Sequence, residues 1–343
     1  MISTSPDTIA WMNSGDGRIA FGYGPFESTQ TPPESGCAFY MNDFGLADPA
    51  PWKIPQRWEL LAPDAAAKKF PAPAANVAWE PVEAVPFSDI FQKSMECIHA
   101  GDFEKIVPVV TERGTSDGNP GKKFLAASIH HGPPLVAYGI DDCAGGFAGA
   151  TPEWLFSLHG DGLQTMALAG TARAEDHEVF AADEKEIREH EYVAHTLVSK
   201  LAHLGHVTRH PRDILNLGSI VHFHTRIDVT PRVRPDENEL VNLLHPTPAL
   251  GILPRTPENL ATLIGWRRKL ECPDTFGAPF GLWLDGQFNA VVAIRGIWWR
   301  ENSIFLPAGC GLIEASRLVN EWRELRLKRE AVKHFMAIHG PPK

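Results

Sequence analysis

Two segments of this chain each carry a pair of glutamates three residues apart. Glu186 and Glu189 form the first pair, Glu321 and Glu324 form the second, and Lys328 follows four residues after the second pair. On a helix, residues at these spacings share one face. A single such face is usually solvated and stabilised by Glu–Lys pairs, but its repetition on a second helix favours a shared carboxylate site.

Two buried-strand positions also carry groups able to move a proton. Lys105 stands at the entrance of the β-rich run Lys105–Val110, and Glu153 precedes the apolar residues Trp154–Phe156. A surface lysine is solvated, whereas desolvation at a buried strand lowers the pKa of a lysine and can make it a base. A carboxylate among apolar residues must be paired, protonated or functional.

Histidine and glycine residues supply candidate binding groups. His222 and His224 are two residues apart on a predicted strand, a spacing that suits a metal pair, but no third ligand of this type lies near, so we favour His222 as a substrate contact. Gly170, Gly309 and Gly311 end predicted strands and leave backbone N–H groups open to an anionic ligand.

Helices and strands alternate along the chain in a way that positions these groups. Helical spacing predicts helices over 87–99, 183–204, 239–244, 258–270 and 317–334, and short apolar β-prone runs predict strands between them. This mixture predicts an α+β chain with large mixed or antiparallel sheets. Residues 1–85 carry no readable motif, and 63–73 resembles a surface linker.

Composition excludes several classes of protein. The 343 residues are 43% hydrophobic and 22% charged, which is typical of a globular protein, and the net charge of −10 argues against nucleic acid or an anionic membrane as partner. No apolar run is long enough for a membrane span, and the N-terminal residues lack the basic-then-apolar pattern expected of a signal segment. Five scattered cysteines without metal-ligand spacing indicate reduced thiols and a cytoplasmic location.

Nine short motifs occur in an order that resembles the chorismate-utilising enzymes, the family of anthranilate, aminodeoxychorismate, salicylate and isochorismate synthases. Each motif is weak alone, but together they cover roughly residues 85–336. In chain order they are Lys105-Ile106-Val107, Ala150-Thr151-Pro152-Glu153, Leu168-Ala169-Gly170-Thr171, Lys185-Glu186-x-x-Glu189-His190, His222-Phe223-x-Thr225, His245-Pro246-Thr247-Pro248-Ala249, Ile294-Arg295, Ala308-Gly309-x-Gly311 and Glu321-Trp322-Arg323-Glu324-x-x-x-Lys328.

The resemblance implies a fold and a domain organisation. We expect two similar stacked subdomains with large, mostly antiparallel β-sheets and outer helices, and an active site between them. Residues 1–85 form the N-terminal part of the sheet region, and 86–340 form the chorismate-binding catalytic region of one intertwined domain. The expected partner is chorismate, with no nucleic acid and no membrane, and the expected state is a monomer or weak homodimer.

Within the family, the His-Pro-Thr-Pro-Ala box is similar to that of the isochorismate synthases, so the resemblance implies a Mg²⁺-dependent isomerase of menaquinone or siderophore biosynthesis. Lys105 then activates water and protonated Glu153 acts on the departing hydroxyl. Glu189 and Glu324 hold Mg²⁺, and Glu186 and Glu321 hold its waters. The expected substrate contacts are Gly170, Thr171, His222, Ala249, Arg295, Gly309 and Lys328.

Three alternatives remain open. A salicylate synthase also eliminates pyruvate from isochorismate and differs in its product. A chorismate-binding protein with altered or lost activity has no turnover. A structural metal protein uses His222 and His224 to bind zinc, and loses that zinc when these histidines are removed.

Overall fold

One continuous antiparallel sheet forms the frame of the molecule. The computed structural model describes residues 5–71, 74–118, 120–142 and 144–338. Within them the sheet has 17 strands. The strands are β1 (Ile9–Asn13), β2 (Ile19–Thr29), β3 (Cys37–Met41), β4 (Trp52–Leu61), β5 (Val77–Trp79), β7 (Val109–Ser116), β8 (Val136–Asp141), β9 (Gly145–Thr151), β10 (Trp154–His159), β11 (Gly162–Arg173), β12 (Gly205–Arg209), β13 (Asp213–Asn216), β14 (Ile220–Pro231), β16 (Pro279–Leu284), β17 (Gln287–Val292), β18 (Gly296–Arg300) and β19 (Ser303–Gly309).

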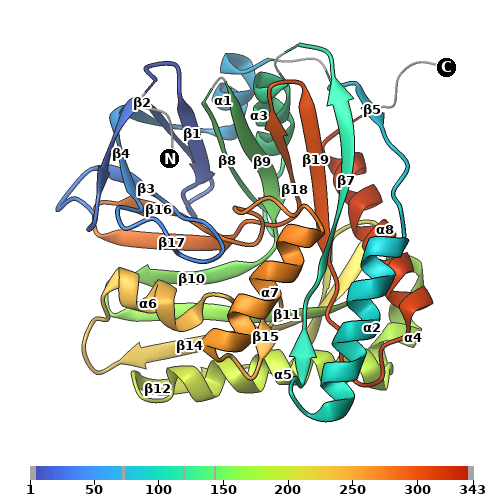
Figure 1. Cartoon of the computed structure of the whole chain (residues 1–343). Helices are drawn as coiled ribbons and strands as arrows, with labels where there is room; N and C mark the ends of the chain where they lie inside the picture. Colours follow the sequence, from blue (N-terminus) through green and yellow to red (C-terminus); the bar gives the residue numbers. More distant parts are fainter. Residues whose placement is uncertain (1–4, 72–73, 119, 143, 339–343) are drawn as a thin grey trace.

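The pairing of neighbouring strands gives the path of the sheet. From one edge the order is β5-β7-β19-β18-β9-β8-β1-β2-β4-β3-β16-β17-β10-β11-β14, and both β12 and β13 pair with β14 at the other edge. Every one of these pairings is antiparallel. The pairing of β3 with β16 joins the upper strands of Figure 1 to the lower ones. A separate two-stranded ribbon pairs β6 (Lys105–Ile106) with β15 (Ile252–Leu253).

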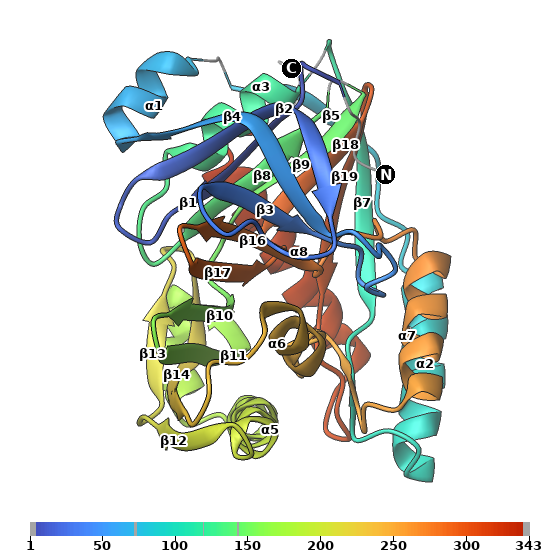
Figure 2. The ribbon, with the colours of Figure 1, turned by 90° about the vertical axis from the view of Figure 1, so that its left-hand side faces the viewer.

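The helices lie outside this sheet. In Figures 1 and 2, α1 and α3 lie at the upper end of the molecule and α5 runs beneath the lower strands. Helices α2 and α7 are neighbours in both views and form the right-hand flank of Figure 2. The helices are α1 (Pro63–Lys69), α2 (Val85–Ala100), α3 (Gly121–Ile129), α4 (His177–Ala181), α5 (Glu184–Leu201), α6 (Glu237–Leu244), α7 (Pro257–Lys269) and α8 (Leu318–Phe335). The predicted α+β class, with a large antiparallel sheet and outer helices, is confirmed.

Aromatic side chains pack around the middle of the sheet, where β3 pairs with β16. Trp52 packs against Phe288 with ring centroids 4.7 Å apart, and Tyr40 packs edge-on against Trp52 at 5.1 Å. These rings come from β3, β4 and β17, so they bridge early and late parts of the chain. Large buried aromatic rings contribute strongly to core stability, which fixes the junction between the upper and lower strands.

Two local predictions differ from the structure. Residues 63–73 resemble a linker, but α1 covers Pro63–Lys69, because Pro63 occupies the first turn and the alanines that follow favour a helix. The run Lys105–Val110 is two strands and not one, since Pro108 cannot donate a ladder hydrogen bond and separates β6 from β7.

The division at residue 85 stays a prediction. Strand β1 pairs with β8 and β3 pairs with β16, so the described part of the first 85 residues belongs to the common sheet.

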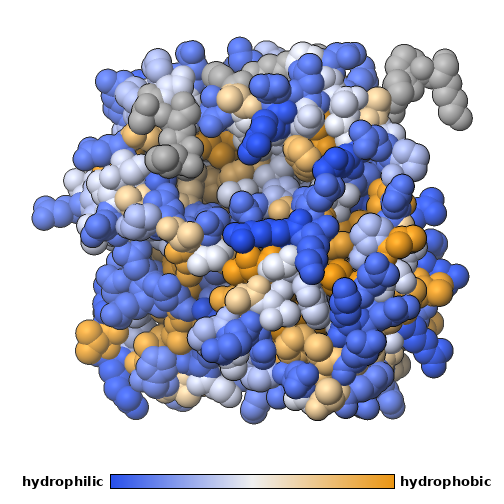
Figure 3. All heavy atoms as spheres, in the orientation of Figure 1, coloured by the Kyte–Doolittle hydropathy of each residue, from blue (hydrophilic) through white to orange (hydrophobic). Residues whose placement is uncertain are grey.

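The described cysteines, Cys37, Cys97, Cys272 and Cys310, are free thiols, and Cys143 lies outside the described residues. No helix in the described ranges has the length and hydrophobicity needed to cross a bilayer. On the face in Figure 3, apolar residues are scattered among hydrophilic ones.

Candidate active site

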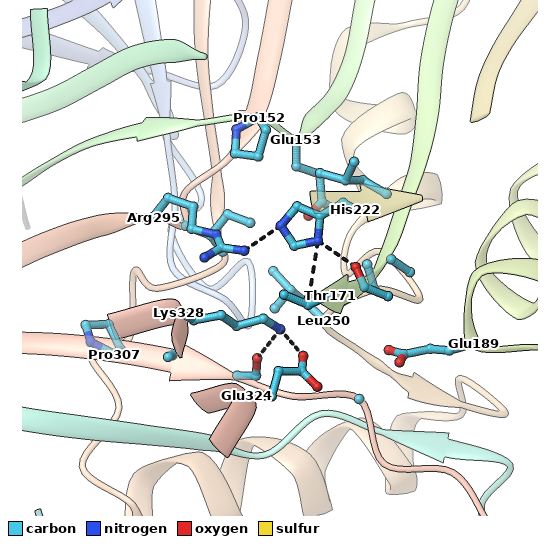
Figure 4. A pocket seen from close by; sticks show the side chains of 18 of the residues that line it. Pro152, Glu153, Thr171, Glu189, His222, Leu250, Arg295, Pro307, Glu324 and Lys328 are labelled. Carbon is cyan, nitrogen blue, oxygen red and sulfur yellow. Dashed lines mark hydrogen bonds and ion pairs between the residues drawn. The ribbon is translucent and has the colours of Figure 1, made fainter. Parts of the chain in front are cut away.

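A pocket collects most of the side chains that the sequence singled out (Figure 4). Ten of the thirteen predicted site residues line it, namely Glu153, Gly170, Thr171, Glu189, His222, Ala249, Arg295, Gly309, Glu324 and Lys328. The other three, Lys105, Glu186 and Glu321, lie next to the lining residues of the pocket but are not among them. The pocket residues come from strands, links and helices that are far apart in the sequence, so the sheet is what brings them together.

Helices α5 and α8 position the four glutamates. The side chain of Asp183 caps α5 by accepting hydrogen bonds from the N–H groups of Lys185 and Glu186 at 3.0 and 3.1 Å. The cap fixes the first turn and turns Glu186 and Glu189 inward with the apolar face of α5. On α8, Glu321 is buried on the same face as Leu325, four residues later.

Lys185 lies among these carboxylates. Its Nζ is 2.7 Å from Glu186 Oε1, 3.6 Å from Glu189 Oε2 and 3.4 Å from Glu321 Oε1. Burial opposes a charge on Lys185, but the surrounding glutamates outweigh it and raise the pKa of its ammonium. Burial, together with the charges of neighbouring glutamates, raises the pKa of Glu186 and of Glu321.

Lys105 is fully buried behind the pocket wall. Its Nζ lies 3.0 Å from Glu189 Oε1, yet it makes no hydrogen bond of regular geometry to any residue in the described ranges. Burial of Glu189 opposes its charge, but Lys105 and Lys185 outweigh this and lower the pKa of that carboxyl to about 2. The side chains of Lys105 and Glu189 both lie against Gly311, and Gly311 lines the pocket. Only this glycine therefore separates Lys105 from the pocket.

Glu153 occupies the short link between β9 and β10 and is only 3% exposed. Its Oε1 accepts a hydrogen bond from the hydroxyl of Thr247 at 2.9 Å. Burial raises the pKa of Glu153 to about 7, although the hydrogen bond from Thr247 and the charge of Lys105 act in the opposite direction. A large fraction of this carboxyl is therefore protonated at neutral pH.

His222 and Arg295 form a polar wall. His222 Nδ1 lies 2.6 Å from the Gly170 carbonyl oxygen, to which it donates, and Arg295 Nη2 donates to His222 Nε2 at 2.7 Å (Figure 4). Burial and the charge of Arg295 hold the pKa of His222 well below its usual value, so the ring is neutral and serves as an acceptor.

Arg295 keeps a free donor for a ligand. It lies between β17 and β18 with a φ of 55°, a left-handed conformation that costs a non-glycine residue about 1 kcal/mol or more. Its Nη1 is buried and has no hydrogen-bond partner among the described residues. A guanidinium held in a strained conformation with an unpaired donor beside a pocket is suited to binding a carboxylate.

The remaining predicted contacts lie close by. Lys328 pairs with Glu324 at 2.6 Å and donates to the Gly309 carbonyl at 2.8 Å. Gly170 has a φ of 76°, where a side chain would be strained. The N–H of Thr171 is already bonded to Glu186 Oε2 at 2.9 Å, so Arg295 is the better partner for a substrate carboxylate.

The two strand histidines do not act as a pair. His222 bonds to Gly170 and Arg295, whereas His224 bonds to Asp213 Oδ1 at 2.8 Å and does not line the pocket. Among the described residues, no group of three or more acidic, histidine or cysteine side chains is arranged as a ready-made metal site. The zinc alternative has no support in this geometry.

A family model described as chorismate binding enzyme matches residues 50–337. The chain belongs to this family. The predicted resemblance to the chorismate-utilising enzymes is confirmed, and with it, at the level of the family, the prediction of an isochorismate synthase-like enzyme. The match begins at residue 50, ahead of the region of about 85–336 that carries the nine motifs.

Several relatives within the chorismate-binding family carry the name isochorismate synthase. The chain is 26% identical over 327 residues to isochorismate synthase EntC of Escherichia coli K12, covering 86% of this chain and 80% of that protein. It is 31% identical over 265 residues to the salicylate biosynthesis isochorismate synthase of Pseudomonas aeruginosa, covering 72% of this chain and 54% of the relative.

Solved structures of the family share this fold. MenF, the menaquinone-specific isochorismate synthase of Escherichia coli, has a TM-score of 0.81 at 19% identity, covering 97% of this chain and 90% of MenF. DhbC, a putative 2,3-dihydroxybenzoate-specific isochorismate synthase of Bacillus anthracis, has a TM-score of 0.79 at 20% identity, covering 97% of each chain.

Two residues of the site had no role assigned from the sequence, Lys185 and Thr247. Both stand inside motifs that point to the chorismate-binding family, the first in Lys185-Glu186-x-x-Glu189-His190 and the second in the His-Pro-Thr-Pro-Ala box. The motifs marked the positions, but only the folded chain shows that these side chains contact the carboxylates of the site.

Proposed function

We propose that the protein is an isochorismate synthase, an isomerase that converts chorismate to isochorismate. Water adds at C2 of the ring and the C4 hydroxyl leaves as water, so one water is consumed and one released. Such an exchange needs a proton acceptor near the attacking water and a proton donor near the leaving hydroxyl. The observation that carries the proposal is Glu153, a buried carboxyl whose pKa of about 7 lets it donate a proton.

Glu153 is the general acid for the leaving hydroxyl. It lies across the pocket from Glu324 and Lys328 in Figure 4. Thr247 donates to Oε1, which orients the carboxyl and leaves Oε2 to carry the proton. A protonated carboxyl can donate a hydrogen, whereas a carboxylate can only accept one. Burial favours the protonated form of Glu153, which is the form that the reaction requires.

Lys105 is the base that activates water. Its buried Nζ contacts Glu189 and has no regular hydrogen bond to the described residues, so once the ammonium has given up its proton, the amine has a lone pair free to accept one from water. Gly311 separates it from the pocket by a residue with no side chain. A water bound at this glycine would lie between Lys105 and a ring held in the pocket.

Arg295 and Lys328 bind the carboxylates of chorismate. The unpaired Nη1 of Arg295 is a donor for one carboxylate, and His222 holds the guanidinium in place through Nε2. Because His222 is neutral, it orients Arg295 without adding a charge of its own. Positioning of this kind fixes which ring carbon faces the base and which faces the acid.

Glu189 and Glu324 fit a Mg²⁺ ion. The four glutamates offer only oxygen donors, Glu321 Oε2 is buried with no hydrogen-bond partner among the described residues, and a cationic ammonium already lies among them. Mg²⁺ prefers this donor type and takes few protein ligands, completing its octahedron with waters and substrate. When bound, the ion neutralises a substrate carboxylate. Glu186 and Glu321 would hold waters of the bound ion.

Product analysis tests the proposal. Purified protein is incubated with chorismate and MgCl₂, and the products are separated by chromatography and assayed for pyruvate. We expect isochorismate without pyruvate, and loss of turnover in excess EDTA that added MgCl₂ restores. Salicylate with equimolar pyruvate would instead identify a salicylate synthase, and unchanged chorismate would identify a binding protein. Full activity in EDTA would overturn the metal assignment.

A further inference from the structure

Lys185 is a cation at the centre of a cluster of carboxylates. Its Nζ contacts three of them, at 2.7, 3.4 and 3.6 Å, and they belong to both α5 and α8. Glu186 and Glu321 are 9% and 1% exposed, so water poorly screens the repulsion between each of them and the neighbouring Glu189 and Glu324. The ammonium therefore holds together two helix faces that would otherwise repel each other.

The balance of charge in the cluster depends on three lysines. Lys105 forms an ion pair with Glu189, and Lys328 forms one with Glu324. Lys185 is the nearest cation to Glu186 and Glu321. Glu321 Oε2 still has no hydrogen-bond partner among the described residues. Removal of Lys185 would leave two buried carboxylates from different helices without a counter-ion.

A Mg²⁺ ion held by Glu189 and Glu324 would lie beside a like charge. Lys185 Nζ is 3.6 Å from Glu189 Oε2, and it also contacts Glu186 and Glu321, the two side chains assigned to the waters of the metal. Lys185 has room to leave, because a second, open pocket begins beside it and is lined by Asp176 and Asp183. The side chain is 20% exposed and can extend into that pocket without unfolding α5.

We propose that Lys185 is a resident counter-ion that stabilises the site in the absence of metal and leaves when Mg²⁺ enters. The inference rests on the metal assignment in the proposed function. Binding of Mg²⁺ is then an exchange of one cation for another, and Lys185 weakens the metal affinity while it protects the metal-free protein. It is a positioning residue for the carboxylates and touches no reacting atom.

Calorimetric titration with MgCl₂ and thermal unfolding in EDTA, both without chorismate, test this exchange. Lys185→Met should lower the unfolding temperature in EDTA and bind Mg²⁺ at least about tenfold more tightly, because a competing charge is gone. Lys185→Arg keeps the charge and should restore stability in EDTA. Lys200→Met is the matched control: it removes one lysine from the same helix, where Nζ donates to the Leu243 carbonyl at 3.1 Å, and it should leave the Mg²⁺ affinity unchanged.

A measurement on the unaltered protein covers the case in which Lys185→Met fails to fold. Reductive methylation followed by mass spectrometry reports how accessible each lysine amine is. Addition of MgCl₂ should speed methylation of Lys185 relative to Lys200. Unchanged or slower methylation, or an Mg²⁺ affinity that Lys185→Met leaves equal or weaker, would overturn the exchange. A protein that passes these tests but makes no isochorismate would refute the proposed reaction and leave the exchange standing.

Discussion

At the scale of single residues, Glu153 connects the structure most directly to the chemistry. The sequence predicted an acid with a raised pKa because apolar residues follow it, and its burial in the link between β9 and β10 agrees with that reasoning. The contact with Thr247 was not predicted, because the two residues lie 94 positions apart in the chain. Only the fold brings the His-Pro-Thr-Pro-Ala box to this carboxyl.

Activity should follow the protonation of Glu153. Because the carboxyl must be protonated to donate, and its pKa is about 7, kcat should fall as pH rises above that value. Glu153→Gln keeps the shape but cannot donate an acidic proton, so we expect turnover at least ~100-fold slower with nearly normal chorismate binding. Steady-state kinetics across pH checks both. A Gln variant with near-normal turnover would show that the proton comes from another group.

The same carboxyl should make stability depend on pH. Its pKa rises from 4.5 to about 7 on folding, so Glu153 destabilises the fold by roughly 3 kcal/mol once pH exceeds the folded value, and by little below the unfolded one. Glu153→Gln should therefore stabilise the protein much more at about pH 8.5 than at about pH 5. Denaturant unfolding measures this, with exposed Glu83→Gln as the control. An equal effect at both pH values would contradict the buried-acid account.

Lys105 should be replaceable by no other cation. Lys105→Arg preserves a positive charge beside Glu189 but cannot accept a proton, because a guanidinium stays protonated. We expect both Lys105→Arg and Lys105→Ala to lose isochorismate formation, and circular dichroism should confirm that each is folded. If the arginine variant turned over at a normal rate, Lys105 would be an electrostatic contact and water would be activated elsewhere.

At the scale of elements, the helices were the best predicted parts of the site. The expected helices 183–204 and 317–334 correspond to α5 and α8 within a few residues, since their apolar spacing is long and regular. Helix α3 was missed and α1 was taken for a linker, because their short sequences offer few periodic positions. The role of Lys185 could not be read from one helix, since Glu321 stands on the other.

The turn after β19 gives a test of how closely Lys105 and Glu189 approach the pocket. A Cβ added to Gly311 would overlap Glu189 Oε1 and lie 2.8 Å from Lys105 Cε. Gly311→Ala should therefore displace both groups and reduce kcat at least ~100-fold, as misplacement by about 1 Å does in other enzymes. Gly265→Ala on α7, where an added Cβ meets nothing within 4 Å, should keep full activity. An active Gly311→Ala enzyme would rule out this arrangement.

At the scale of the whole molecule, the continuous sheet is what assembles the site. Glu153 follows β9, Gly170 lies on β11, His222 on β14, and Arg295 precedes β18. The order of motifs in the sequence identified the family, and the family predicted the α+β architecture. The order of motifs could not predict which strands pair between β5 and β14, because strand partners are determined by long-range packing and not by local sequence. The cytoplasmic location and the monomeric or weakly dimeric state stay predictions.

Turnover of chorismate in water enriched in ¹⁸O tests the central claim most directly. The account requires that solvent water attack C2 while the original C4 hydroxyl departs. Isochorismate isolated at early times and examined by mass spectrometry and ¹³C NMR should therefore carry one ¹⁸O, located in its C2 hydroxyl. Isochorismate without label would mean that the hydroxyl migrates within the substrate, and the assignment of Lys105 as the base for water and Glu153 as the acid would be contradicted.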